Sequence, residues 1–196
     1  IIASIDNNTA VMYGNTNEYT KNHNSVLPNI KSKNQSWNKN TIGLKVMNTI
    51  ETKLSLGKIE NFDVGLRLSA TISTCYNQFE FMSFSNNRIN MHVKQENDTA
   101  WINENIFTGG RFAHYSNEGK NREDVHHILL EKPDTNPFLI NNNLWIKPSI
   151  EGEVAKVGVK IQGIYNTLLS ARFEKNEAPI YSVQFFSNTS DKPSQY

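Results

Sequence analysis

Three short runs near the C-terminal end of the chain decide its fold class: Val157-Gly158-Val159-Lys160-Ile161-Gln162, Leu169-Ser170-Ala171-Arg172-Phe173-Glu174 and Tyr181-Ser182-Val183-Gln184-Phe185. In each run an apolar residue alternates with a polar or small one. Side chains of a strand alternate between its two faces, so this spacing predicts strands with one face on a core and the other toward solvent. The sequence is therefore that of a β-protein.

Similar runs precede these three, over residues 42–46, 53–58, 62–72 and 89–94. Short strands separated by Asn and Gly turns predict an all-β fold with a single antiparallel β-sandwich. We expect a jelly roll rather than an immunoglobulin-like sandwich because residues 73–87 and 108–121 read as long crossing loops. A short helix is predicted over residues 121–131. No internal repeat is detected.

The chain has 196 residues and a mass of 22.4 kDa, which suits one domain. Residues 1–40 are polar and are expected to form an N-terminal arm or long loop, followed by the sandwich over residues 41–196. The formal charge of +1 excludes a global field that would recruit a polyanion. No apolar stretch approaches the roughly 20 residues of a membrane span. The missing initial Met suggests a cleavage product or a trimmed piece of a longer chain.

Candidate chemistry is sparse. The adjacent His126 and His127 cannot easily share one metal ion, and neither His92 nor His114 has a second histidine at ligand spacing. The single cysteine, Cys75, cannot form an intrachain disulfide and is expected to be a small buried side chain. No nucleophile elbow or phosphate loop is present. We therefore expect neither an enzyme nor a metal or cofactor site.

Asparagine is unusually common, with 28 residues in the chain. Asn tolerates left-handed backbone conformations and is enriched in turns. We interpret the high asparagine content as the result of many loops and of an AT-rich coding sequence.

Lysines without acidic neighbours surround Trp37 in the N-terminal region. They are Lys21, Lys31, Lys33 and Lys39. Lysines can neutralise phosphates and an aromatic ring can stack on a base, so this stretch is a candidate nucleic-acid-binding segment. The alternative is an ordinary solvated segment, since the stretch has no arginine, the better partner for phosphate.

Two tryptophans are candidates for an interface or a receptor-binding site. Trp101 follows a polar turn and is expected to be an exposed binding aromatic. Trp145 lies between Leu144 and Ile146, which indicates a core position or a subunit interface.

The tract Leu144-Trp145-Ile146-Lys147, with Val157-Gly158-Val159 and Tyr181-Ser182-Val183-Gln184-Phe185, resembles the C-terminal part of circovirus-type capsid proteins. The resemblance covers about 55 residues. It implies a jelly roll that self-assembles in many copies into a small icosahedral shell around nucleic acid, and a location in the virion. The Arg-rich arm of that family has no counterpart here.

A second stretch, Asn86-Asn87-Arg88 through Asp98-Thr99-Ala100-Trp101 to Phe107, is similar to Dr-type fimbrial adhesins. Those proteins are immunoglobulin-like pilus subunits and usually carry a disulfide, which Cys75 alone cannot form. This resemblance implies an extracellular, cell-surface domain that binds a host receptor or glycan. The sequence thus predicts a viral coat protein first and an adhesin as the alternative.

Overall fold

The computed structural model describes residues 8–21, 23–33, 37–114, 123–131, 139–152, 157–174 and 181–186 of the chain. All regular elements in these ranges are strands, so the all-β class is confirmed. Every pairing between these strands is parallel. The predicted antiparallel pairing is therefore wrong.

The strands form three sheets. Sheet A contains β1 (Thr9–Gly14), β5 (Asn38–Met47), β8 (Phe62–Ala70), β11 (Ile89–Gln95), β14 (His126–Leu130), β18 (Val157–Gln162) and β21 (Tyr181–Phe186). Sheet B contains β2 (Thr20–Lys21), β6 (Thr49–Ile50), β9 (Ser73–Cys75), β12 (Trp101–Asn103) and β15 (Ile140–Asn141). Sheet C contains β3 (Asn24–Leu27), β4 (Ile30–Lys31), β7 (Lys53–Glu60), β10 (Gln78–Ser85), β13 (Ile106–Ala113), β16 (Leu144–Ile146), β17 (Ser149–Glu151), β19 (Thr167–Leu169) and β20 (Arg172–Glu174).

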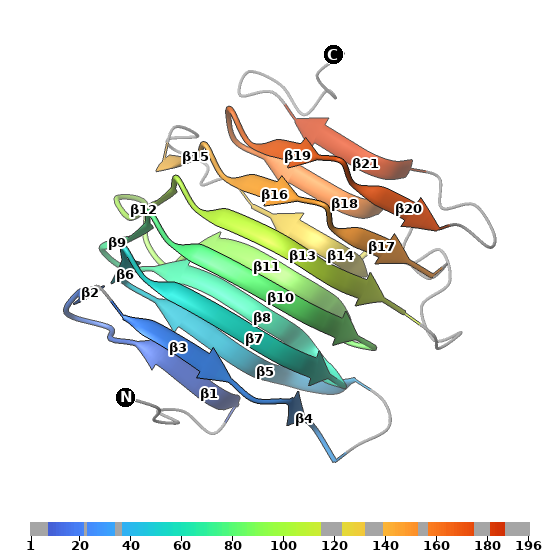
Figure 1. The fold of residues 1–196 in the computed structure, drawn as a ribbon, viewed down its shortest axis with the longest axis horizontal. Helices are drawn as coiled ribbons and strands as arrows, with labels where there is room; N and C mark the ends of the chain where they lie inside the picture. Colours follow the sequence, from blue (N-terminus) through green and yellow to red (C-terminus); the bar gives the residue numbers. More distant parts are fainter. Residues whose placement is uncertain are drawn as a thin grey trace.

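The chain visits sheets A, B and C in that order and then begins again, so it winds as a parallel β-helix. We call each circuit a coil. Figure 1 shows sheets A and C stacked face to face, with the short strands of sheet B along one side. Each strand pairs with the strand one coil further along the chain, at the usual spacing of about 4.8 Å.

The predicted jelly roll and immunoglobulin-like sandwich both require antiparallel neighbours. The alternation behind that prediction reports which faces of a strand are buried. The alternation does not show whether the partner strand runs parallel or antiparallel, or how far away it lies in the sequence. Here the partner lies a full coil away, as the pairing of β8 with β5 and β11 shows.

Unequal coil lengths explain why no repeat is visible in the sequence. Ile42 pairs with Val64 and Val64 with Ile89, steps of 22 and 25 residues. The next step, from Ile89 to His126, is 37 residues. A solenoid tolerates such insertions because they extend the turns and leave the ladder of strands intact.

Two local predictions are also wrong. Residues 9–31, predicted as part of a polar arm, contain β1 to β4, and β1 pairs with β5 while β3 pairs with β7. The predicted helix over 121–131 contains β14, which is held between β11 and β18. Pairing on both edges overrides the local helical preference. Residues 1–7, 34–36, 115–122 and 132–138 lie outside the described ranges.

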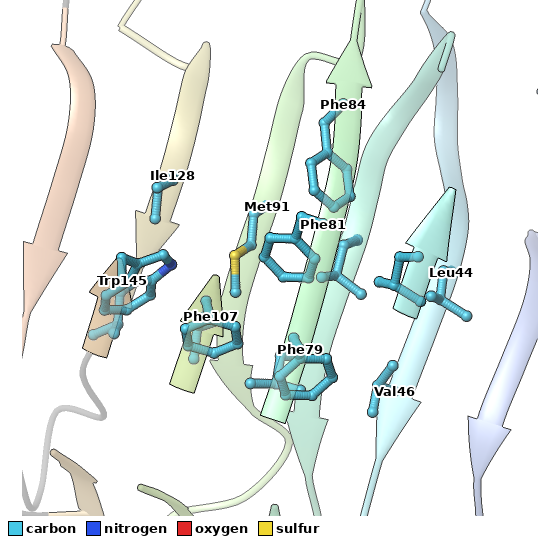
Figure 2. Close-up of a cluster of buried hydrophobic side chains, with 14 of the residues drawn as sticks. Leu44, Val46, Phe79, Phe81, Phe84, Met91, Phe107, Ile128 and Trp145 are labelled. Carbon is cyan, nitrogen blue, oxygen red and sulfur yellow. The ribbon is translucent and has the colours of Figure 1, made fainter. Parts of the chain in front are cut away.

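The core fills the space between sheets A and C. Aromatic side chains from sheet C stack from coil to coil: Phe79 on Phe107 with ring centroids 5.1 Å apart, and Phe107 on Trp145 at 4.8 Å. Figure 2 shows these rings in a row, with Met91 and Ile128 of sheet A nearby. This continuous interior stack joins successive coils.

Candidate binding ridge along sheet B

One residue of each coil occupies the same position in the turn from sheet B to sheet C. These residues, which we call the turn row, are Glu51, Tyr76, Glu104, Asn142 and Tyr165. Their φ angles range from 49° to 57°, in the left-handed region. The backbone N–H of Glu51, Tyr76, Glu104 and Asn142 donates across to the next coil in the same way, each at 3.3 Å. The repeated bond shows that the positions are equivalent.

Directly behind the turn row runs a ladder of amides, three of them buried and the last half-buried. It consists of Asn77, Asn105, Asn143 and Asn166, each one residue after a member of the turn row. The Nδ2 group of each donates to Oδ1 of the next, at 2.9, 2.9 and 3.0 Å. A fully bonded buried amide network fixes the local backbone. The ladder therefore holds the turn row rigid and at constant spacing.

Exposed aromatic side chains collect along sheet B. Among the side chains whose exposure the structure describes, they are Tyr19 (43% exposed), Tyr76 (59%), Trp101 (44%) and Tyr165 (75%). Tyr19 directly precedes β2, Tyr76 follows β9, Trp101 begins β12, and Tyr165 follows Ile164, which bridges to Asn141 of β15. Together with the turn row, Tyr19 and Trp101 make up what we call the binding ridge.

The backbone under two of these aromatics is unfavourable for them. A bulky side chain at positive φ is rare, and such a conformation costs on the order of 1–3 kcal/mol. Tyr76 has a φ of 57° and Tyr165 a φ of 55°. Asn or Gly would occupy these turns at lower cost, as Asn142 does in the same row. Aromatic side chains in such positions, facing solvent, point to a role for the side chain itself.

The outward face of sheet B supplies the rest of the ridge. Ser73 and Cys75 are small and only 8% and 6% exposed. In the next coil they pair with the larger Trp101 and Asn103, respectively. The carboxylate of Glu104 accepts a hydrogen bond of 2.9 Å from Asn142 Nδ2. Lys21 lies 5.6 Å from the centre of the Tyr19 ring. The ridge thus combines aromatic faces with amide and carboxylate groups.

Cys75 is a buried free cysteine, as predicted. Burial raises the pKa of its thiol, so the thiolate is scarce at neutral pH. In sheet B it pairs with Asn103 of the next coil and directly precedes Tyr76.

The structure separates the two candidate tryptophans. Trp101 is exposed on the ridge, whereas Trp145 is 1% exposed and stacked on Phe107. Trp145 therefore belongs to the core, which is one of the two positions that the sequence indicated, and the alternative at an interface does not fit its burial.

The candidate nucleic-acid residues do not form one cluster. Lys21 lies in β2 of sheet B, while Lys31, Lys33 and Lys39 lie in or near β4 and β5. Lys31 pairs with Glu60 at 2.7 Å. Trp37 is half-buried against Val125 and edge-on to His114, with ring centroids 6.3 Å apart. Binding of nucleic acid stays a prediction, and part of the Trp37 ring is covered by these contacts.

A charged network on sheet A contains His92. Arg67 Nη2 lies 3.1 Å from His92 Nδ1, and His92 Nε2 lies 2.7 Å from Glu131 Oε2. A guanidinium only donates and a carboxylate only accepts, so the neutral ring carries its proton on Nε2. Burial lowers the pKa of His92, and hydrogen bonding to His92 lowers the pKa of Glu131 to about 2. Both ring nitrogens are engaged, so His92 is not placed to act as a general base.

Two more histidines are packed inside the solenoid. The rings of His114 and His127 lie 4.3 Å apart, and both are almost fully buried. Burial lowers the pKa of His114 to about 4 and that of His127 well below its ordinary value. Among the residues that the structure describes, no three His, Cys, Asp or Glu side chains form a group that could hold a metal ion. The pair is a neutral structural element.

No helix in the described ranges is long and apolar enough to span a membrane. Comparison of the chain with protein-family models, with curated proteins and with solved structures finds no match. The site therefore has to be interpreted from its own geometry.

Sequence reasoning found Trp101 but missed the turn row. The available signal is a dipeptide with Asn in second place, as in Tyr76-Asn77, Glu104-Asn105 and Tyr165-Asn166. Its spacing is irregular, because the coils differ in length, and a fixed-period search does not detect it.

Proposed function

We propose that this chain is an adhesive domain that binds a glycan through the binding ridge, the cell-surface alternative left open by the sequence. The observation that carries the proposal is the gathering of the exposed aromatics of the described ranges along sheet B. Two of them, Tyr76 and Tyr165, occupy backbone positions that disfavour a bulky side chain.

The chemistry of the ridge suits a sugar. The C–H faces of a pyranose ring pack on the flat faces of Tyr and Trp, whose polar tips stay in contact with water. Glu104, Asn142 and Asn103 add carboxylate and amide groups that hydrogen-bond to hydroxyls. The ladder behind the turn row fixes these groups before binding, which reduces the entropy lost when the ligand is held.

The resemblances implied an antiparallel sandwich in both cases, a jelly roll for the coat protein and an immunoglobulin-like domain for the adhesin. The parallel pairing in the described ranges removes that support from both, so the adhesive role is proposed from the ridge alone. Self-assembly into many copies and packaging of nucleic acid stay predictions. Light scattering of the purified chain checks the first, and salt-dependent binding of single-stranded DNA checks the second.

Binding can be followed through tryptophan fluorescence, because Trp101 is exposed whereas Trp37 is half-buried and Trp145 is buried. We suggest a glycan array to find a ligand, followed by titration of the wild type. Changing Tyr76 and Tyr165 to Ser should weaken binding at least about tenfold, which corresponds to about 1.4 kcal/mol. Trp101→Phe should remove most of the fluorescence change.

The matched control is Met82→Ser, at a residue of sheet C that is 68% exposed and lies away from the ridge. It should bind like the wild type. Equal binding by the double tyrosine variant, or no glycan bound by the wild type, would refute the proposal.

A further inference from the structure

We infer that the ligand of the binding ridge is an uncharged saccharide chain of several units lying along the solenoid axis. The inference rests on the proposed function and specifies its ligand class. It follows from the spacing of the aromatics, from the charges between them and from the rigidity of the turn row.

Spacing sets the length and direction of the ligand. Tyr76, Glu104, Asn142 and Tyr165 belong to four successive coils, as their equivalent turns show. Three steps of about 4.8 Å place Tyr76 and Tyr165 roughly 14 Å apart along the axis. One pyranose ring cannot cover both side chains. A ligand that uses both must be an oligomer, and the row that joins them runs parallel to the axis.

Charge sets the class of sugar. Glu51 and Glu104 flank Tyr76 in the preceding and the following coil, so a sugar stacked on Tyr76 has a carboxylate on either side. A carboxylate accepts hydrogen bonds from hydroxyl groups and repels another anion. Asp98 lies in the exposed turn that leads to Trp101. Lys21 lies beside Tyr19, two coils before Tyr76, so the charges around Tyr76 are those of the carboxylates. They favour hydroxyl-rich neutral sugars and disfavour uronic, sialylated or sulfated chains.

Asn142 completes the row between Glu104 and Tyr165. Its amide already donates to Glu104, and an amide also has an oxygen that accepts and a second N–H that donates. The combination of acceptor, donor and aromatic face in consecutive coils matches a repeating neutral ligand. A basic peptide could pair with Glu51 and Glu104, but it would leave the exposed rings of Tyr76 and Tyr165 without a use.

The test uses the whole chain and three sets of probes followed by Trp101 fluorescence and calorimetry. The first set is neutral glucose, mannose and N-acetylglucosamine oligomers of increasing length. The second is galacturonic acid oligomers of the same lengths, and the third is an oligolysine peptide. We expect a neutral oligomer to bind, with affinity rising at least about tenfold from the dimer to an oligomer that spans both tyrosines, and then levelling off.

Variants separate the contributions. Tyr165→Ser should abolish the gain with length while leaving the affinity for the dimer within about twofold, because the short ligand contacts only one aromatic. Changing Glu51 and Glu104 to Gln should raise the affinity for galacturonic acid oligomers by about tenfold, since it removes the repulsion and keeps the shape of the side chains. Met82→Ser again serves as the control.

Failures of the two proposals are distinguishable. Tighter binding of galacturonic acid oligomers than of neutral ones would overturn the inference and leave glycan binding standing. Equal affinity for dimers and long oligomers would overturn the extended arrangement in the same way. Binding of oligolysine without any glycan would overturn both.

Discussion

Replacing Asn105 by Ala tests the amide ladder that positions the ridge. Asn105 is 0% exposed and lies in the middle of the ladder. Its Oδ1 accepts from the Asn77 side chain at 2.9 Å and from the Asn77 backbone N–H at 3.3 Å. Its Nδ2 donates to the Thr74 carbonyl at 3.0 Å and to Asn143 Oδ1 at 2.9 Å. The substitution therefore removes four hydrogen bonds at once.

The cost can be worked out group by group. The Asn77 side chain still donates to the Thr49 carbonyl, and Asn143 Oδ1 still accepts from the Asn105 backbone N–H. The Asn77 backbone N–H and the Thr74 carbonyl are both buried, and each loses its hydrogen bond to the Asn105 side chain. At roughly 1–3 kcal/mol for each unsatisfied group, we expect a loss of roughly 2–6 kcal/mol in the free energy of unfolding.

Asn166→Ala is the matched comparison because Asn166 is half-buried at the end of the ladder. Water can replace its bonds to Asn143, so we expect a loss of only about 1 kcal/mol. Urea unfolding followed by circular dichroism measures both variants, and hydrogen exchange at the Asn77 amide reports the local effect. The reasoning fails if Asn105→Ala costs no more than Asn166→Ala, or if the Asn77 amide stays as protected as in the wild type.

Three further predictions concern the core, the buried histidines and the turn row. Leu66→Ala should cost roughly 2–5 kcal/mol by urea unfolding because Leu66 is fully buried, whereas Leu169→Ala, at a residue that is 50% exposed, should cost far less. The pKa of His114 is about 4 when folded and 6.5 ordinarily, so the unfolded chain binds more protons between these values. The stabilising contribution of neutral His114 should therefore be fully present above pH 6.5, and the free energy of unfolding should fall by roughly 3 kcal/mol as the pH drops to 4. His114→Phe should flatten this pH dependence, as measured by urea unfolding at each pH. Tyr76→Asn should leave the melting temperature unchanged or raised while glycan binding falls, because Asn tolerates the left-handed turn; a marked drop in melting temperature would contradict a functional reason for Tyr76.

The sequence located strands well and their partners poorly. Alternation correctly identified β8 and β18, because each strand must bury one face whatever its partner is. Direction could not be predicted, since parallel and antiparallel strands share the same alternation. Pairing depends on a register between residues 22 to 38 positions apart, such as Ile42 with Val64 and Ile106 with Leu144. Nothing in a single run of residues encodes that distance.

Local irregularities account for the errors within correctly placed strands. Leu169, expected in the core, is exposed because Ser170 has a φ of 53° and interrupts the alternation, while Leu168 packs against the core. Val64 is buried, but in a small separate cluster, because Gly65 occupies the inward position against Asn87 and Asn90. Local features of this kind change which residues face inward without altering the composition of the strand.

The abundance of asparagine acquires a structural explanation. Part of it forms the ladder, and part of it occupies left-handed turns, as at Asn48, Asn61 and Asn86. Loops alone, the interpretation from composition, do not account for it. Against this background, four of the five turn-row positions depart from the use of asparagine, with Tyr at two and Glu at two; outside the row, Lys147 and Ser170 have the same backbone conformation. A sequence that uses asparagine freely for this backbone conformation and still places tyrosine there gives up stability at those positions. Departures of this kind are expected at functional sites, and here they coincide with the exposed aromatics of sheet B.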